Sequence, residues 1–180
     1  MKNSSLHEVV QENGITVIKD SADTAFAEIS VCETNCLLKM YKDGESKADT
    51  TIISCQTDND TKICKNELIR FILSGDPDSL NWYIGMDFED IHNFCSAAKR
   101  LQFIYFEEDI SAVNNIAEQI NALFPNTGDL LIYVQGSDCG IGARLFDRLP
   151  FSRWIQFSLD ETLNTNIKVS IWYNPATAKE

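Results

Sequence analysis

The chain has 180 residues, of which 44% are hydrophobic and 10% aromatic, enough to bury an ordinary core within one domain. Its 27 acidic residues against 15 basic ones give a formal net charge of −12. A charge of this size opposes non-specific binding to nucleic acid or to an anionic membrane, and it favours a basic partner. We therefore expect no direct contact with nucleic acid and no membrane association.

The N-terminal sequence favours a cytoplasmic location. The opening segment MKNSSLHEVVQENG has no apolar run after its lysine, so it does not have the pattern of a signal peptide. No stretch approaches the roughly 18–20 uninterrupted apolar residues of a membrane-spanning helix. Six cysteines are present, and in a cytoplasmic protein we expect them to be reduced.

The first half of the chain predicts an antiparallel β-meander. Apolar residues between Ser5 and Gly14 are interpreted as a short opening helix. Turn-like connections then separate four β-rich segments, at 15–19, 25–32, 36–42 and 50–56. A helix follows over 62–75, where apolar residues recur at helical spacing before a glycine and a proline.

The stretch from Leu80 to Gln135 alternates between strand and helix. Its strand segments are almost wholly apolar, which suits strands covered on both faces, and they lie at 80–86, 101–108 and 126–135. Amphipathic helices are expected between them, at 87–100 and 109–125. After a glycine-containing turn and a short helix, the segments 151–159 and 166–174 predict a C-terminal hairpin.

The predicted fold class is therefore mixed, α+β or α/β. It consists of an N-terminal antiparallel β-meander, an alternating strand–helix core and a C-terminal hairpin. We expect a single domain, with a β-rich half over about 1–75 and an α/β half over about 76–180.

Acidic residues begin both helices of the alternating stretch. The first group is Asp87, Glu89 and Asp90, and the second is Glu107, Glu108 and Asp109. If the strands are parallel, these acids gather along one edge of the sheet, near Asp138. Three interpretations are open: helix caps on a solvated surface, a protein-docking surface, or a magnesium site, because hard cations bind several carboxylate oxygens. Caps are the commonest role for acids in these positions.

The segment Gly136–Gly142 follows a strand and opens a helix, and locally it resembles the GxxxGxG turn of short-chain dehydrogenases. In that family most of the nucleotide-binding sheet follows the motif, whereas here only 38 residues remain. No Tyr-x-x-x-Lys pair is present either. We therefore interpret the segment as a turn in which Gly140 and Gly142 adopt positive φ angles.

The cysteines Cys32, Cys36, Cys55 and Cys64 form an incomplete pattern for a four-thiolate zinc site. Zinc ligands usually come in closely spaced pairs, but eight residues separate Cys55 from Cys64. We interpret these cysteines as buried or free thiols, and we expect no metal and no cofactor. The two histidines have no partner at a recognisable spacing, and the common catalytic motifs are absent, so the sequence predicts a protein that is not an enzyme.

Aromatic residues are numerous in the acid-rich half, and Trp154 is the most informative of them. It shares the polar face of its predicted strand with Ser152, Gln156 and Ser158. A tryptophan exposed among polar neighbours is a common anchor at protein interfaces. Trp154 therefore joins the acids as a candidate partner-binding residue.

In its general character the chain resembles the immunity proteins of bacterial toxin–immunity pairs, such as those of contact-dependent growth inhibition. The shared features are small size, acidity, acid–aromatic segments such as 105–109 (YFEED), and no catalytic motif. The resemblance implies an inhibitor that occludes the basic active site of a nuclease toxin. The interface predicted here comprises Asp87, Glu89, Asp90, Glu107, Glu108, Asp109 and Trp154.

Two other functions remain open. One is a small magnesium-dependent hydrolase that uses Asp87, Glu107, Asp109 and Asp138 at the ends of the strands. The other is an acidic secretion chaperone, which would dimerise around an amphipathic segment of its client.

Overall fold

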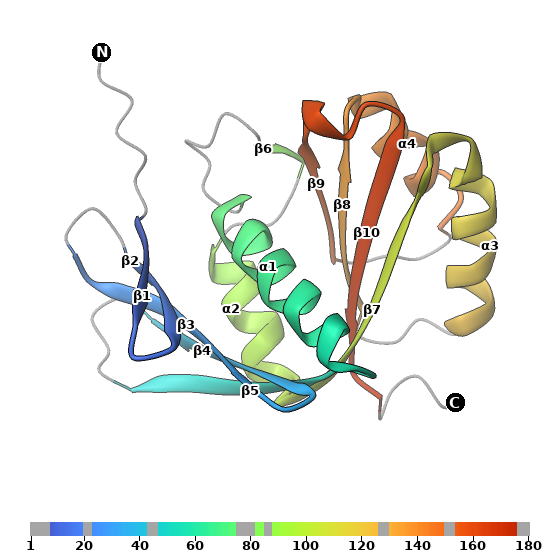
Figure 1. The fold of residues 1–180 in the computed structure, drawn as a ribbon. Coiled ribbons are helices and arrows are strands. Elements are labelled where there is room, and N and C mark those ends of the chain that lie inside the picture. Colours follow the sequence, from blue (N-terminus) through green and yellow to red (C-terminus); the bar gives the residue numbers. More distant parts are fainter. Residues whose placement is uncertain are drawn as a thin grey trace, which may run out of the picture.

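The computed structural model describes residues 8–19, 23–42, 47–74, 82–84, 88–125, 130–149 and 154–175. The strands among them form one mixed ten-stranded sheet, in the order β1-β2-β3-β4-β5-β7-β10-β8-β9-β6. The helices of this part are α1 (Asp58–Ser74), α2 (Phe88–Ala97), α3 (Val113–Leu123) and α4 (Cys139–Phe146). Figure 1 shows how they are arranged around the sheet. The predicted mixed class, with antiparallel strands at its start, is confirmed.

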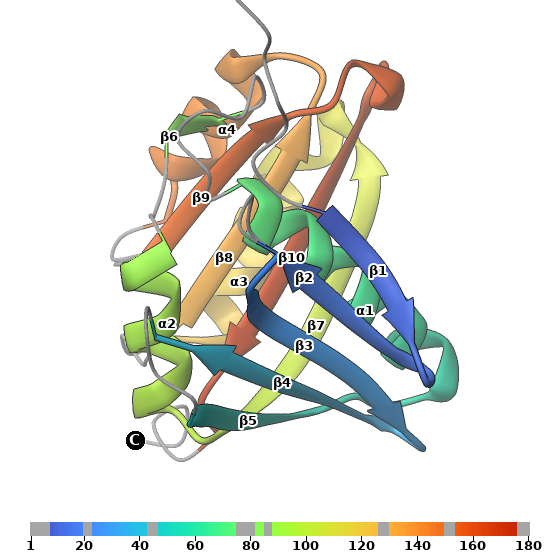
Figure 2. The same ribbon diagram turned by 90° about the vertical axis from the view of Figure 1, so that its left-hand side faces the viewer.

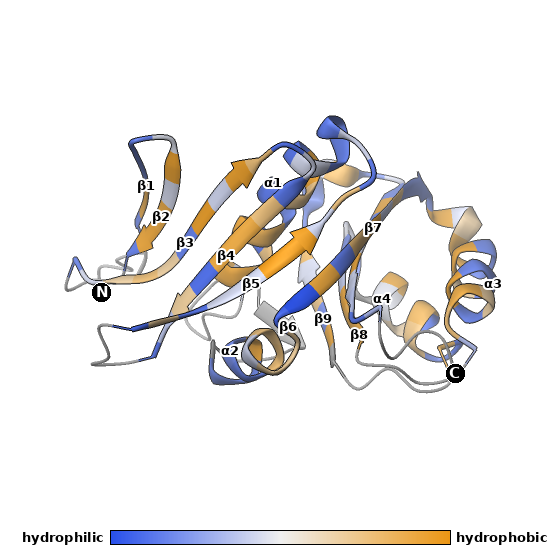
Figure 3. Ribbon diagram, turned by 90° about the horizontal axis from the view of Figure 1, so that it is seen from below, coloured by the Kyte–Doolittle hydropathy of each residue, from blue (hydrophilic) through white to orange (hydrophobic). Residues whose placement is uncertain are grey.

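The first five strands form an antiparallel meander, and the last four of them correspond to the four segments predicted for it. They are β1 (Glu8–Glu12), β2 (Ile15–Lys19), β3 (Ala25–Cys32), β4 (Asn35–Tyr41) and β5 (Ala48–Ser54). Burial alternates along β4, because successive side chains of a strand point to opposite faces. Bands of hydrophobic and hydrophilic residues are visible along β3, β4 and β7 in Figure 3.

The opening segment contains a strand, so the predicted opening helix is wrong. Glu12 pairs with Ile15, which leaves Asn13 and Gly14 as a two-residue connection between β1 and β2. Both residues have positive φ angles, 52° and 81°. This is the conformation of a type I′ hairpin turn, for which Asn-Gly is the preferred sequence. The turn chemistry outweighs the helical spacing of a few apolar residues.

The other five strands are β6 (Trp82–Ile84), β7 (Arg100–Asp109), β8 (Leu130–Gly136), β9 (Trp154–Leu159) and β10 (Asn166–Tyr173). β7 is parallel to β5, and β9 is parallel to β8. β10 is antiparallel to both β7 and β8, so β7, β8 and β9 run in one direction and end at the same edge of the sheet. β6 is antiparallel to β9 and runs the other way.

The predicted C-terminal hairpin is wrong as a pairing, although both of its strands are present. β9 and β10 are not paired, because β8 lies between them in the sheet. In the chain, β9 and β10 are connected by a short 3-10 turn, Glu161–Leu163. β10 is buried on both faces for most of its length, as is typical of a strand in the interior of a covered sheet. Alternation within the two segments identifies strands but not their neighbours.

Helices cover both faces of the sheet and define two hydrophobic cores. α1 lies in the hollow between the meander and the second half of the sheet, where it packs on β3, β4 and β7 (Figures 1 and 2). Residues of α1 and α2 share the first core with both halves of the sheet. α3 and α4 pack on the opposite face of the second half and form the second core. In the described part of the chain, no helix has the length and apolar character needed to cross a membrane.

Candidate functional site

The second acidic group lies at the end of β7, at the edge where β8 and β9 also end (Figure 1). Glu107, Glu108 and Asp109 are exposed. Because side chains alternate along a strand, Glu107 and Asp109 project from one face of the sheet and Glu108 from the other. Glu107 accepts a hydrogen bond of 2.8 Å from the Tyr105 hydroxyl, which places Glu107 on the face that α1 covers. We call this edge the acidic rim; it comprises Glu107, Glu108, Asp109, Asp138, Asp160 and Glu161.

Three carboxylates of the acidic rim are helix caps. Asp109, Asp138 and Asp160 each accept a hydrogen bond from the main-chain amide two residues ahead, at 2.8, 2.8 and 3.0 Å. They begin the turn before α3, the helix α4 and the turn before β10, respectively. The main-chain bond holds the pKa of Asp109 below its usual range. Capping therefore fixes these carboxylates and, for Asp109, favours the charged form.

The first acidic group lies elsewhere in the molecule. Glu89 and Asp90 are in the first turn of α2, which packs against β5 and leads into the start of β7. β7 has 10 residues and spans about 30 Å, whereas α2 has 10 residues and spans only about 15 Å, so the first turn of α2 cannot reach back to the far end of β7. The structure therefore does not bring Glu89 and Asp90 into the acidic rim. Sequence reasoning placed both groups at one edge because it took all three strands to be parallel.

Two of the predicted partner-binding residues cannot be placed as side chains. Asp87 lies outside the described residues. Trp154 belongs to β9, where its backbone is paired with that of Leu131 in β8, but its side chain is outside the described part.

The described carboxylates do not form a compact metal site. In this part of the chain, three thiols have donor atoms that all lie close together, whereas no three carboxylates do. Glu107, Asp109 and Asp138 are therefore neighbours along an edge rather than a preformed magnesium site.

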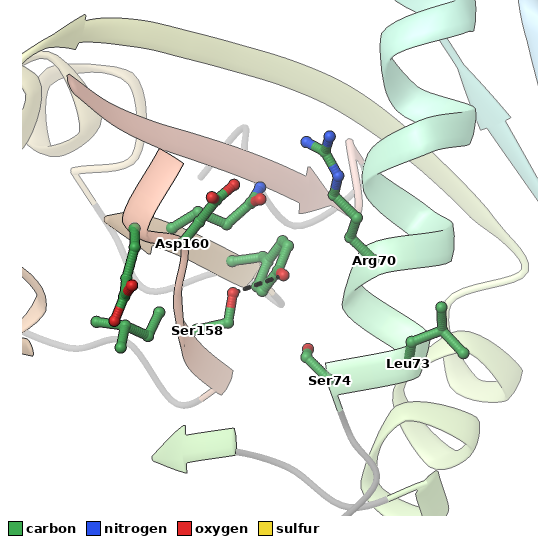
Figure 4. Close-up of a pocket in the computed structure, with 9 residues that line it drawn as sticks. Arg70, Leu73, Ser74, Ser158 and Asp160 are labelled. Carbon is green, nitrogen blue, oxygen red and sulfur yellow. Dashed lines mark hydrogen bonds between the residues drawn. The ribbon is translucent and has the colours of Figure 1, made fainter. Parts of the chain in front are cut away.

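A pocket of about 460 Å³ opens between the C-terminal half of α1 and the ends of β8 and β9. Its lining is mostly polar and consists of Arg70, Leu73, Ser74, Tyr133, Gln135, Ser158, Leu159, Asp160 and Glu161. Figure 4 shows Arg70 and Ser74 on the helix side, facing Ser158 and Asp160 on the strand side. The carboxyl ends of parallel strands are a common place for ligands in sheets covered by helices. The pocket adjoins the acidic rim, because Asp160 and Glu161 belong to both.

A buried carboxylate lies beside this pocket. Glu67 of α1 is only 3% exposed, and it is bonded to Arg70 Nη1 at 2.9 Å. It also accepts hydrogen bonds from Gln135 Nε2 and, at 3.5 Å, from Ser170 Oγ. Burial raises the pKa of Glu67, while Arg70 and Gln135 oppose the shift. The pocket is thus backed by a buried hydrogen-bond network that includes a carboxylate.

A second buried network joins α1 to β8 and β9, and its Ser74, Tyr133 and Ser158 line the pocket. Gln156 is fully buried, and its Nε2 donates to the Ser74 hydroxyl, but its Oε1 has no hydrogen-bond partner. Tyr133 and Ser158 share a hydrogen bond of 2.8 Å, and burial raises the pKa of Tyr133 to about 12. An unpaired buried oxygen is uncommon, because it loses its hydration without compensation.

The sequence interpretation missed this pocket. Gln156 and Ser158 were assigned to a polar, exposed strand face, whereas α1 covers that face. Glu67 lies among the apolar positions of its helix, which indicates a buried carboxylate. The sequence does not show, however, which strand contacts this carboxylate.

Three of the four candidate zinc cysteines do come together. The sulfur atoms of Cys36, Cys55 and Cys64 all lie within 4.8 Å of one another, whereas Cys32 is exposed at the end of β3 and is not in the group. Hydrogen bonds from the thiols of Cys36 and Cys64 hold the pKa of Cys55 far below its usual range. All three are free thiols, and two of them are buried. The sequence did not show that they meet, because they are far apart in the chain and folding brings them together.

The glycines of the Gly136–Gly142 segment serve packing rather than a turn. Gly140 and Gly142 are helical and have no positive φ, so that prediction is wrong. An added Cβ at Gly142 would lie 2.6 Å from the ring of Phe157, so this glycine allows α4 to approach β9 closely. The main-chain amide of Gly140, at the start of α4, already donates a hydrogen bond to the Asp138 carboxylate. A dinucleotide phosphate would need amides at this position.

No protein-family model matches the chain, and no curated protein matches its sequence. A solved structure with some similarity is that of a tryptophan-to-tyrosine mutant of FtsZ from M. jannaschii. The two are 17% identical, with a TM-score of 0.41, over 63% of this chain and 39% of that one. The chain thus matches well under half the length of FtsZ, and a similarity this low carries no argument about function.

Proposed function

We propose that the protein is an acidic binding protein that occludes the basic active site of a partner, in the manner of an immunity protein acting on a nuclease toxin. A nuclease presents a cationic groove to phosphate, and an acidic surface competes for that groove with fast, electrostatically steered association. The net charge of −12 supports attraction over the whole molecule. This function also suits a cytoplasmic protein.

The observation that carries the proposal is that hydrogen bonds hold four carboxylates of the acidic rim. Asp109, Asp138 and Asp160 are held by main-chain hydrogen bonds, and Glu107 by Tyr105. Preorganised side chains lose little conformational entropy on binding, so more of the electrostatic gain is retained in the complex. Glu89, Asp90 and Trp154 lie outside the acidic rim, and in this proposal they are not required for the interface.

The proposal is tested with a candidate nuclease toxin domain, both by rescue of cells that express the toxin and by binding at low and high salt. We expect the double variant Glu107→Lys/Glu108→Lys to lose rescue and to weaken binding by at least about 10-fold. The matched control is Glu8→Lys/Glu118→Lys, which makes the same change in charge at two exposed positions outside the rim. Equal rescue by both double variants would place the interface elsewhere.

The pocket favours a second candidate, a small hydrolase that binds a polar substrate beside the acidic rim. Asp160 and Glu161 line the pocket, and Asp109 and Asp138 are at the same edge. A magnesium-dependent rise in melting temperature that Asp109→Asn abolishes would support this function, and a melting temperature indifferent to magnesium would contradict it. The third alternative, an acidic secretion chaperone, requires a dimer and is tested by the mass of the protein in solution.

A further inference from the structure

The thiols of Cys36, Cys55 and Cys64 come from three separate elements and meet at one point. Cys36 is in β4, Cys55 follows the end of β5, and Cys64 is in α1. Cys36 and Cys64 are fully buried, Cys55 is partly exposed, and none of the three is in a disulfide. All three sulfur atoms lie within 4.8 Å of one another. The group is therefore a largely buried cluster of donor atoms, and Cys55 is its member nearest to solvent.

The backbone fixes this arrangement. Cys36 pairs with Ile53 across β4 and β5, so Cys55, two residues further on, projects from the same face as Cys36. The Cys55 amide donates to the Thr34 carbonyl at 2.8 Å, which extends the pairing to this position.

The helix that carries the third thiol is anchored just beyond Cys55. Thr57 and Asp60 cap each other, with bonds of 3.0 Å from Thr57 N and 3.1 Å from Asp60 N. This capping box sets the direction in which α1 leaves β5, and it turns Cys64 inward. Each thiol is thus held by hydrogen-bonded main chain, as the ligands of a preformed metal site must be.

The spacing and the charge both suit a divalent, thiophilic ion. Zinc–sulfur bonds of about 2.3 Å place tetrahedral sulfurs about 3.8 Å apart, so a group within 4.8 Å needs an inward shift of about 1 Å at most. Three thiolates and Zn²⁺ leave one negative charge, and the charge of Lys65 acts on Cys36. A monovalent soft ion would leave two negative charges beside the core. Hard ions such as Mg²⁺ prefer oxygen ligands.

We propose that Cys36, Cys55 and Cys64 form a three-thiolate zinc site, with water as the fourth ligand on the exposed side of Cys55. The thiols that are still protonated lose their protons to solvent when the ion binds. Zinc would join β4, β5 and α1, the elements that connect the meander to the rest of the sheet. This site is separate from the acidic rim and does not depend on the function proposed for it.

The test is a titration of the reduced, metal-free protein with Co²⁺, a spectroscopic substitute for zinc, under anaerobic conditions. We expect one Co²⁺ per chain, visible bands of tetrahedral thiolate coordination, their loss on addition of Zn²⁺, and a higher melting temperature with zinc. The variant Cys55→Ser replaces the partly exposed ligand and should bind at least about 10-fold more weakly. The matched control, Cys32→Ser, changes an exposed cysteine outside the group and should bind like the wild type.

A second measurement needs no variant. Zinc should protect Cys36, Cys55 and Cys64 from alkylation by iodoacetamide and leave Cys32 reactive, as mass spectrometry of the peptides can show. The proposal is overturned if wild-type protein gives no tetrahedral cobalt spectrum, if Cys55→Ser binds cobalt as tightly as the wild type, or if zinc leaves the three thiols as reactive as before.

Discussion

The two faces of the second half of the sheet are built from the same strands but have different chemistry. On the face towards α3 and α4, the buried side chains of β8, β9 and β10 are apolar, among them Ile132, Phe157 and Ile171. On the face towards α1, the same strands bury Gln135, Gln156, Ser158 and Ser170. The side chains of the first face only have to pack closely against α3 and α4, whereas those of the second face must also form hydrogen bonds with their buried polar groups.

This difference indicates where function is to be sought. An apolar interface between helix and sheet gains stability from burial alone. Burial of polar groups costs free energy unless every group is hydrogen-bonded. A polar interface therefore stabilises the packing of α1 less than an apolar one would. The pocket lies on the polar face, where Arg70 and Ser74 meet the strands.

The largest expected effect breaks the polar face at its carboxylate. Glu67→Ala removes the acceptor of Gln135 and Ser170 and leaves a cavity, so we expect the free energy of unfolding to fall by about 3 kcal/mol. Chemical denaturation at pH 7 measures it. The control Glu118→Ala, at an exposed position of α3, should change the stability by less than about 0.5 kcal/mol. Equal effects would mean that the network around Glu67 contributes nothing.

The conservative change Glu67→Gln tests the charge of the same group. Because the folded protein holds the Glu67 proton more tightly than the unfolded chain does, the contribution of Glu67 to wild-type stability should fall as pH rises from 4.5 through the raised pKa. Glutamine does not titrate, so the variant lacks this contribution. Over that pH range the variant should therefore become more stable relative to the wild type. A difference that is independent of pH would show that Glu67 has an ordinary pKa.

A smaller effect is expected on the apolar face. Gly142→Ala drives a methyl group into the ring of Phe157 and should destabilise the protein by about 2 kcal/mol, measured by denaturation. Gly140→Ala is the matched control in the same helix, since its Cβ comes no closer than 3.3 Å to Asp138 Oδ1. Equal stability of the two variants would contradict the inference that position 142 needs a glycine for the close packing of α4 on β9.

The smallest effect has the opposite sign. Gln156 buries an amide oxygen without a partner, so Gln156→Met should leave stability unchanged or raise it by up to about 1 kcal/mol in thermal unfolding. The control is Ser158→Ala, which removes the bond to Tyr133 and should destabilise by about 1 kcal/mol. A marked loss of stability in Gln156→Met would show that the amide is satisfied and that the two faces are closer in character than they look.

Much of the fold followed from local pattern. The predicted segments 15–19 and 25–32 coincide with β2 and β3, because alternation and turn residues act over a few neighbouring positions. α1 begins four residues before the predicted start at 62, since the capping box of Thr57 and Asp60 adds a turn. The opening strand was missed although its Asn-Gly turn is equally local.

The sequence by itself determined the helices, most strands, the capping role of Asp109 and the acidity of the edge, because each depends on residues close together in the chain. Only the tertiary structure decided which strands are neighbours. That choice inserted β8 between β9 and β10, separated Glu89 and Asp90 from the acidic rim, covered Gln156 with α1 and joined Cys36, Cys55 and Cys64. Strand order depends on how all the apolar faces are buried at once, and that information is spread over the whole chain.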